Sequence, residues 1–238
     1  MRNLILIVIV FLPIVAIGQT TNPAFADSIP TVVDSTYRED QIYIGLTFNL
    51  LNNKPKFLSQ NGFSGGINAG VLRDFPLNEN RNIAIAVGLG LGFDTYNQNL
   101  SITKNADGST SFTSLEDSGE YDKNYFSLYT LDLPLEFRWR TSTFTSYKFW
   151  RIYGGLKLSY VYYFKSVYKG NNNNRTIKIN DIPELERLRL GAHISFGYNK
   201  FNFQIQYAIT PFFNNAKLEN GEAFKFSVLK FGLKFYLF

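Results

Sequence analysis

The sequence predicts a closed, eight-stranded, antiparallel up-and-down β-barrel that spans a membrane. Three observations predict it: eight segments alternate apolar with polar residues, the connections between them are alternately short and long, and the charged side chains of these segments share one face. Alternation of this kind gives a strand one apolar and one polar side. Because each apolar face spans about ten residues, a tilted strand of that length crosses a bilayer.

The first residues have the layout of an export signal. Arg2 precedes an uncharged apolar run from Leu4 to Ile17, and the small residues Ala16 and Gly18 stand just before Gln19. We therefore expect a secretory signal peptide over residues 1–18, since the run is short for a transmembrane helix. The alternative is an uncleaved N-terminal anchor. Residues 19–40 lack periodicity and contain two prolines, so we expect a flexible periplasmic lead-in there and the barrel over 41–238.

The eight alternating segments span roughly 41–51, 62–73, 82–103, 124–140, 149–168, 187–199, 200–213 and 223–238. Their apolar faces occupy alternate positions from Ile42 to Leu50 in the first, Ile83 to Phe93 in the third, Tyr129 to Trp139 in the fourth, Ile152 to Tyr162 in the fifth, Leu188 to Phe196 in the sixth, Phe201 to Ile209 in the seventh and Leu229 to Leu237 in the last. None of these faces holds a charge. A soluble sandwich breaks its outer face with charge, so the pattern favours strands that contact lipid.

The opposite faces combine small residues with large charged ones. The charged set is Asp132, Glu136, Arg138, Arg151, Lys157, Arg189, Lys230 and Lys234. It predicts either a charged conduit or a plug of paired side chains. The plug is favoured, because an eight-stranded barrel is only just wide enough for its own side chains and buried charges need partners. Glycines at 66, 70, 88, 90 and 92 are expected to leave room for long Arg and Lys side chains opposite.

Loop lengths predict the orientation of the barrel. The connections at 75–82, at 141–149 and at Asn199-Lys200 are short, whereas those at 52–61, 105–124, 170–184 and 214–222 are long and polar. Short periplasmic turns and long outer loops alternate in this way in outer-membrane barrels, which puts both termini in the periplasm. Aromatic girdles are expected at both interfaces. Their members are Trp139, Tyr147, Phe149, Trp150, Tyr236 and Phe238 at the short-turn end, and Tyr125, Tyr129, Tyr162, Phe164, Tyr168, Phe212 and Phe213 at the long-loop end.

Composition excludes several classes of protein. The chain of 238 residues has no Cys, which removes disulfides, thiolate metal sites and a lipid-bearing cysteine. The net charge of +5 is scattered without a basic cluster, so no nucleic-acid partner is expected. No apolar run after residue 18 is long enough for a spanning helix.

The single histidine, His193, lies on the polar face of the sixth segment. One His without Cys does not make a dedicated metal site unless several carboxylates stand beside it, and Glu184 and Glu186 belong to the preceding loop. A hydrolase site built from His193 and Ser195 is the catalytic alternative, but no motif supports it. We expect a hydrogen-bonded interior histidine, and no catalytic, cofactor-binding or metal-binding residues.

The last residues, KFGLKFYLF, resemble the C-terminal signal by which outer-membrane barrels are recognised by their assembly machinery. That signal has a polar residue, a glycine two positions later, and hydrophobic residues three and five after the glycine, and a terminal Phe is typical. The matching residues here are Lys230, Gly232, Phe235, Leu237 and Phe238.

At family level, residues 41–238 resemble the small PorT-like outer-membrane β-barrels of the porin family. The resemblance is carried by the stretches 66–100, 131–140 and 150–166. It implies an outer-membrane location and, from the namesakes of the family, an accessory role in type IX protein secretion. We expect a non-enzymatic anchor or interaction component whose partners are outer-membrane lipid, the barrel-assembly machinery and other secretion or envelope proteins. The alternative is a narrow or gated pore for small solutes.

Overall fold

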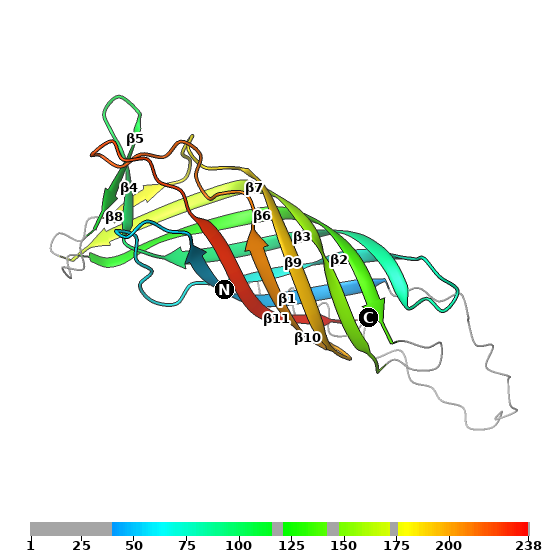
Figure 1. Ribbon diagram of the computed structural model, residues 1–238. Coiled ribbons are helices and arrows are strands. Elements are labelled where there is room, and N and C mark those ends of the chain that lie inside the picture. The colour runs from blue at the N-terminus through cyan, green and yellow to red at the C-terminus, as the bar shows by residue number, and fades with distance from the viewer. Residues whose placement is uncertain (1–39, 116–120, 142–147, 172–175, 238) are drawn as a thin grey trace, which may run out of the picture. The chain divides into compact units, whose positions relative to one another are not determined.

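The computed structural model describes residues 40–115, 121–141, 148–171 and 176–237, so the expected signal peptide and nearly all of the expected lead-in lie outside the described residues. Eight strands form the barrel in Figure 1: β1 (Gln41–Asn52), β2 (Gly65–Pro76), β3 (Ile83–Asn97), β6 (Tyr121–Arg140), β7 (Trp150–Gly170), β9 (Leu188–Tyr198), β10 (Phe201–Ala208) and β11 (Ser227–Tyr236). Each pairs antiparallel with the next along the chain, and β11 pairs with β1. The sheet therefore closes without a free edge, and the predicted fold class is confirmed.

The two faces of the strands are assigned as the alternation predicts. On β6, Leu131, Leu133 and Leu135 are 45–48% exposed on the outer surface, whereas Asp132 and Glu136 are at most 2% exposed inside. The apolar outer face is the one that contacts lipid in a membrane barrel. Among the described residues, no helix has the length and apolar character needed to cross a bilayer.

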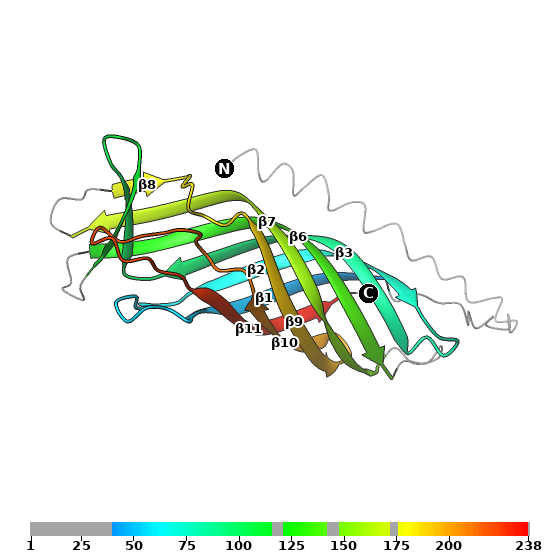
Figure 2. The ribbon, with the colours of Figure 1, turned by 45° about the horizontal axis from the view of Figure 1, so that its top comes forward.

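The long connections contain structure that alternation does not predict. The third segment, expected to continue to residue 103, ends as β3 at Asn97, and a separate hairpin follows, made of β4 (Leu100–Lys104) and β5 (Thr110–Ser114). A further short strand, β8 (Thr176–Ile179), pairs with the outer part of β7. Figures 1 and 2 show β4, β5 and β8 gathered at one end of the barrel, which we call the long-loop end.

The break between β3 and β4 has a local cause in Asn99. Its side-chain oxygen accepts the backbone N–H of Ser59 at 2.7 Å, and its amide nitrogen donates to the carbonyls of Phe57 at 2.8 Å and Leu115 at 3.0 Å. One buried side chain thus joins the β1–β2 connection to the end of the hairpin. Asparagine favours such side-chain bonds to nearby backbone groups over continued strand pairing.

An apolar cluster fills the barrel at the long-loop end. We call its aromatic members the aromatic plug: Tyr96, Phe112, Phe126, Phe164, Phe212, Phe213, Phe224 and Phe226. All are at most 4% exposed. The rings pack at close range, with centroids 4.7 Å apart for Phe126 and Phe212 and 5.3 Å for Phe112 and Phe213. Offset and edge contacts of this kind contribute beyond the burial of their area.

The aromatic plug corrects part of the expected girdles. Phe164, Phe212 and Phe213 lie inside the barrel rather than at the outer membrane interface, and at the other end Phe149 and Tyr236 are also buried. Trp139, Trp150 and Tyr162 face outward and are each at least 39% exposed. Tyr129 packs against Tyr162 and is partly exposed, as are Tyr125 and Tyr168. Tyr147 and Phe238 lie outside the described residues.

A β-bulge explains why Phe164 points inward. Opposite β6, Tyr129 pairs with Tyr163 but Thr130 pairs with Val161, so Tyr162 is an extra residue on β7. An extra residue reverses the alternation beyond it. Arg151 and Ser159, at odd positions, face inward before the bulge, and Phe164 faces inward after it.

Candidate functional site

The candidate site is the barrel interior, where the charged faces of six strands meet. At the short-turn end its centre is Glu136 of β6, which is fully buried. One carboxylate oxygen accepts Arg138 Nε at 3.1 Å and Nη2 at 3.0 Å. The other accepts Lys234 Nζ of β11 at 2.9 Å and His193 Nε2 of β9 at 3.2 Å. Three strands are joined through one carboxylate.

Asp74 of β2 is a second buried carboxylate beside this centre. Arg140 donates to it in a forked geometry, Nη1 to Oδ1 at 3.0 Å and Nη2 to Oδ2 at 2.9 Å, and Arg138 Nη1 reaches the same Oδ1 at 3.1 Å. Forked arginine–carboxylate pairs are among the stronger hydrogen-bonded ion pairs. Arg138 therefore bridges the two carboxylates. We call this set the short-turn network: Asp74, Glu136, Arg138, Arg140, His193 and Lys234.

A middle layer lies between the short-turn network and the aromatic plug. Lys157 Nζ is 3.1 Å from Asp132 Oδ2, and Lys230 Nζ is 2.5 Å from Asp94 Oδ2. The other oxygen of Asp94 accepts Asn49 Nδ2 at 3.0 Å. These bonds connect β1, β3 and β11 on one side and β6 with β7 on the other.

Two of the eight predicted interior charges have no carboxylate partner among the described residues. The Arg151 guanidinium lies over the ring of Phe149, 4.4 Å from its centroid, and that of Arg189 lies over Phe212 at 4.5 Å. Both side chains are at least 92% buried, and Arg151 Nε and Nη1 and Arg189 Nη1 have no hydrogen-bond partner in the described part of the chain. Stacking on aromatic faces supplies part of the missing stabilisation.

All eight predicted interior charges thus point into the barrel, and six of them form ion pairs: Asp132, Glu136, Arg138, Lys157, Lys230 and Lys234. Sequence reasoning missed three partners, Asp74, Asp94 and Arg140. Each continues an inward face already identified, Asp94 after Gly92, Arg140 after Arg138, and Asp74 beyond the expected end of the second strand. Following the alternation to the strand ends would have found them.

The glycine-rich faces make room for a tyrosine rather than for long cations. A Cβ on Gly90 would collide with the Tyr43 hydroxyl and come within 2.9 Å of the Ala69 carbonyl. Tyr43 projects from β1 across these glycines, and Lys234 Nζ lies 4.4 Å from the centre of its ring. The Tyr43 hydroxyl lies against Gly70 and Gly90, and the side chains nearest the other three glycines are those of Asp94, Leu72 and Thr130, so the expectation that Arg and Lys occupy this space is wrong.

His193 is engaged as an interior histidine. Because Glu136 is a carboxylate acceptor, the Nε2–H of His193 is the donor of their bond. Ser195 Oγ has no hydrogen-bond partner among the described residues, so His193 and Ser195 do not form a nucleophile–base pair there. Within the same residues no group of three or more His, Asp or Glu side chains is placed to hold a metal ion.

The matched residues of the closing strand divide between the faces of the barrel. Lys230 points inward to Asp94, whereas Phe235 packs its ring 5.2 Å from that of Phe201. A Cβ on Gly232 would collide with the Leu46 carbonyl of β1, so this glycine lets the first and last strands approach. Leu237 is 38% exposed, and Phe238 lies outside the described residues. Recognition by assembly machinery stays a prediction.

Outside the membrane-spanning part, the β4–β5 hairpin is tied to the β10–β11 connection through Glu219. Its Oε1 accepts the hydroxyls of Ser111 at 2.7 Å and Thr113 at 2.8 Å. These two bonds hold the pKa of Glu219 below its ordinary value of 4.5, because they favour the charged carboxylate.

The match to one family model supports the membrane assignment. The family described as "Outer membrane protein beta-barrel domain" matches residues 19–215. No curated protein matches the chain. Among solved structures, the chain is similar to Ail, the attachment invasion locus protein of Yersinia pestis, in complex with the heparin analogue sucrose octasulfate. The identity is 12% and the TM-score 0.33, over 84% of this chain and 99% of that one.

Proposed function

Because the chain belongs to the family of outer-membrane proteins with a β-barrel domain, we propose that it is a non-conducting barrel that acts through the surface of its long-loop end, as a membrane anchor or interaction component. The role is non-enzymatic. We place the short-turn end, where β1 begins at Gln41 and β11 ends at Tyr236, on the periplasmic side, because the strand number is even and short and long loops alternate.

The filled interior is the observation that carries this proposal. Along the barrel lie the short-turn network, the middle layer and the aromatic plug. The ion-pair distances of 2.5–3.1 Å and the burial of the plug residues show that side chains fill most of the lumen. An eight-stranded barrel has little further space to offer a solute. The β4–β5 hairpin and β8 add ordered structure at the long-loop end, and this structure provides a surface for interaction.

Conductance in planar bilayers tests the closed state. The refolded protein should show no steady conductance, while an open porin in the same bilayers provides the positive control. A shift in gel mobility on heating confirms that the protein was folded. Reproducible open channels from the wild-type protein would replace this proposal with the solute pore.

The interaction surface is tested by photo-crosslinking in native outer membranes. A crosslinking residue replaces Lys217 at the long-loop end or, as the matched control, Glu79 at a short turn; both positions are exposed. We expect a discrete crosslinked partner from position 217. Crosslinks from position 79 alone would put the working surface at the other end.

The resemblance to PorT-like barrels extends the proposal to an accessory role in type IX secretion. Deletion of the gene should then lower the amount of secreted cargo, with recovery when the gene is restored. Undiminished secretion would remove this part and leave the anchor role standing.

A further inference from the structure

The charges of the interior do not balance. Among the described residues, seven cations point inward against four carboxylates: Arg138, Arg140, Arg151, Lys157, Arg189, Lys230 and Lys234, and Asp74, Asp94, Asp132 and Glu136. Removing charges from water is costly unless each finds a partner of opposite sign. We therefore looked for a buried cation that has no carboxylate beside it and that borders a cavity large enough for an anion.

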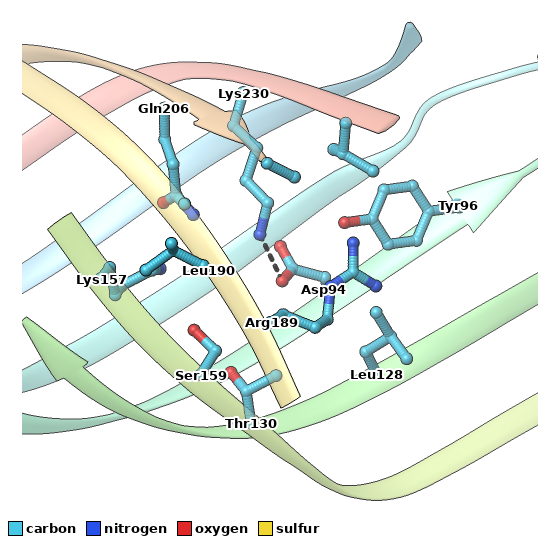
Figure 3. Close-up of a pocket in the computed structure, with 13 residues that line it drawn as sticks. Asp94, Tyr96, Leu128, Thr130, Lys157, Ser159, Arg189, Leu190, Gln206 and Lys230 are labelled. Carbon is cyan, nitrogen blue, oxygen red and sulfur yellow. Dashed lines mark hydrogen bonds and ion pairs between the residues drawn. The ribbon is translucent and has the colours of Figure 1, made fainter. Parts of the chain in front are cut away.

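A cavity of about 30 Å³ lies in the middle layer, directly below the aromatic plug. Its charged wall consists of Lys157, Arg189, Lys230 and Asp94 (Figure 3). Both oxygens of Asp94 are already engaged, one by Lys230 and one by Asn49. The wall therefore presents more positive than negative charge to the space it encloses.

Arg189 is the cation of this cavity wall that has no carboxylate within ion-pair distance among the described residues. It is 8% exposed, forms no ion pair within the described residues, and its Nη1 has no hydrogen-bond partner there. Its guanidinium is held by stacking on Phe212 of the aromatic plug. The side chains of Thr130, Ser159 and Gln206 complete the polar wall (Figure 3).

We propose that this cavity is a binding site for one small monovalent anion of the halide class, held by Arg189 with Lys157 and Lys230. The volume accommodates about two waters or a single such ion, and excludes larger organic anions. Guanidinium, ammonium and hydroxyl groups all donate hydrogen bonds, as a halide requires. Tyr96 of the aromatic plug lines the cavity, and the stacking of Arg189 on Phe212 connects the proposed site to the same plug.

The test is the anion dependence of stability, measured on the protein refolded in lipid vesicles. Reversible denaturant curves are recorded in sodium chloride and in sodium gluconate of equal ionic strength, since gluconate is too large for the cavity. Above the dissociation constant, each tenfold rise in chloride should raise the folded-to-unfolded ratio tenfold, which corresponds to about 1.4 kcal/mol. Equal stability in the two salts would overturn the proposal.

Matched variants locate the effect. Arg189→Gln should abolish the chloride dependence, whereas Arg151→Gln, which alters another buried arginine stacked on a ring, should retain it. Loss in both variants, or retention in Arg189→Gln, would refute the site. Should Arg189→Gln fail to fold, wild-type crystals grown in bromide decide the matter: an anomalous peak against the Arg189 guanidinium supports the proposal, and its absence there ends it.

Discussion

Replacing Glu136 with Gln tests the short-turn network at its centre. The carboxylate accepts four hydrogen bonds, two from Arg138, one from Lys234 and one from His193. A glutamine keeps one acceptor oxygen. Its amide nitrogen is a hydrogen-bond donor and would face the N–H donors that now bind the second carboxylate oxygen. Arg138 still has Asp74, whereas Lys234 is left with no carboxylate partner among the described residues.

The expected cost is about 3–5 kcal/mol, the range for breaking a buried ion pair by removing one partner. Glu136→Gln falls in this range because Lys234, the cation that loses its partner, is itself buried. The free energy of unfolding is measured by urea titration in lipid vesicles for the wild type, Glu136→Gln, Lys234→Met and the double variant.

The double variant separates the ion pair from simple loss of packing. Lys234 contacts Glu136 directly, so the two changes should be non-additive, with the double variant more stable than the sum of the single losses predicts. If Glu136→Gln lies within about 0.5 kcal/mol of the wild type, as surface substitutions do, the buried network has been wrongly described. Strict additivity would show instead that the two side chains do not interact.

Three further outcomes are expected. Leu133→Arg puts a charge on the lipid-facing surface and should cost about 2–4 kcal/mol in the same vesicle assay; a harmless variant would mean that the faces are reversed and that a soluble sandwich must be reconsidered. Deleting Phe238 or replacing Gly232 with Ala should reduce assembly without affecting export, measured as heat-modifiable gel mobility after fractionation; unchanged mobility would count against the closing-strand signal. The stabilisation of the β4–β5 hairpin by Glu219 should be fully present above its ordinary pKa of 4.5 and be lost as pH falls through its lowered folded pKa; amide exchange in the hairpin checks this, with Glu219→Gln as the pH-independent control, and equal pH dependence in both proteins would contradict it.

The barrel was predictable because alternation is a local signal. In β6 the lipid-facing leucines occupy odd-numbered positions and the interior Asp132 and Glu136 occupy even-numbered ones. The position along the strand therefore assigns each side chain to its face without knowledge of any distant contact. The same alternation, followed to the ends of β3 and β6, also places Asp94 and Arg140 in the interior. Most of the interior ion pairs were accessible to sequence reasoning for this reason.

The aromatic plug was not predictable by the same means. Phe164 follows a bulge that depends on the pairing of β7 with β6, and pairing is not visible in one strand. Phe212, Phe213 and Phe224 belong to the β10–β11 connection, which has no period to follow. Whether such rings turn outward to lipid or inward over the lumen depends on chain closure, which a linear pattern does not report.

The origin of the plug residues has a consequence for biogenesis. Tyr96, Phe112 and Phe126 come from β3, β5 and β6, whereas Phe212, Phe213, Phe224 and Phe226 arrive only with the connection between β10 and β11. Contacts between distant parts of a chain form slowly, because the intervening loop must be ordered first. Until β10 and β11 are in place, the charged interior is open to water and its ion pairs compete with hydration. The aromatic plug is thus completed together with the pairing of β11 and β1. We expect a chain truncated before residue 212 to lack a closed barrel and to have a hydrated interior.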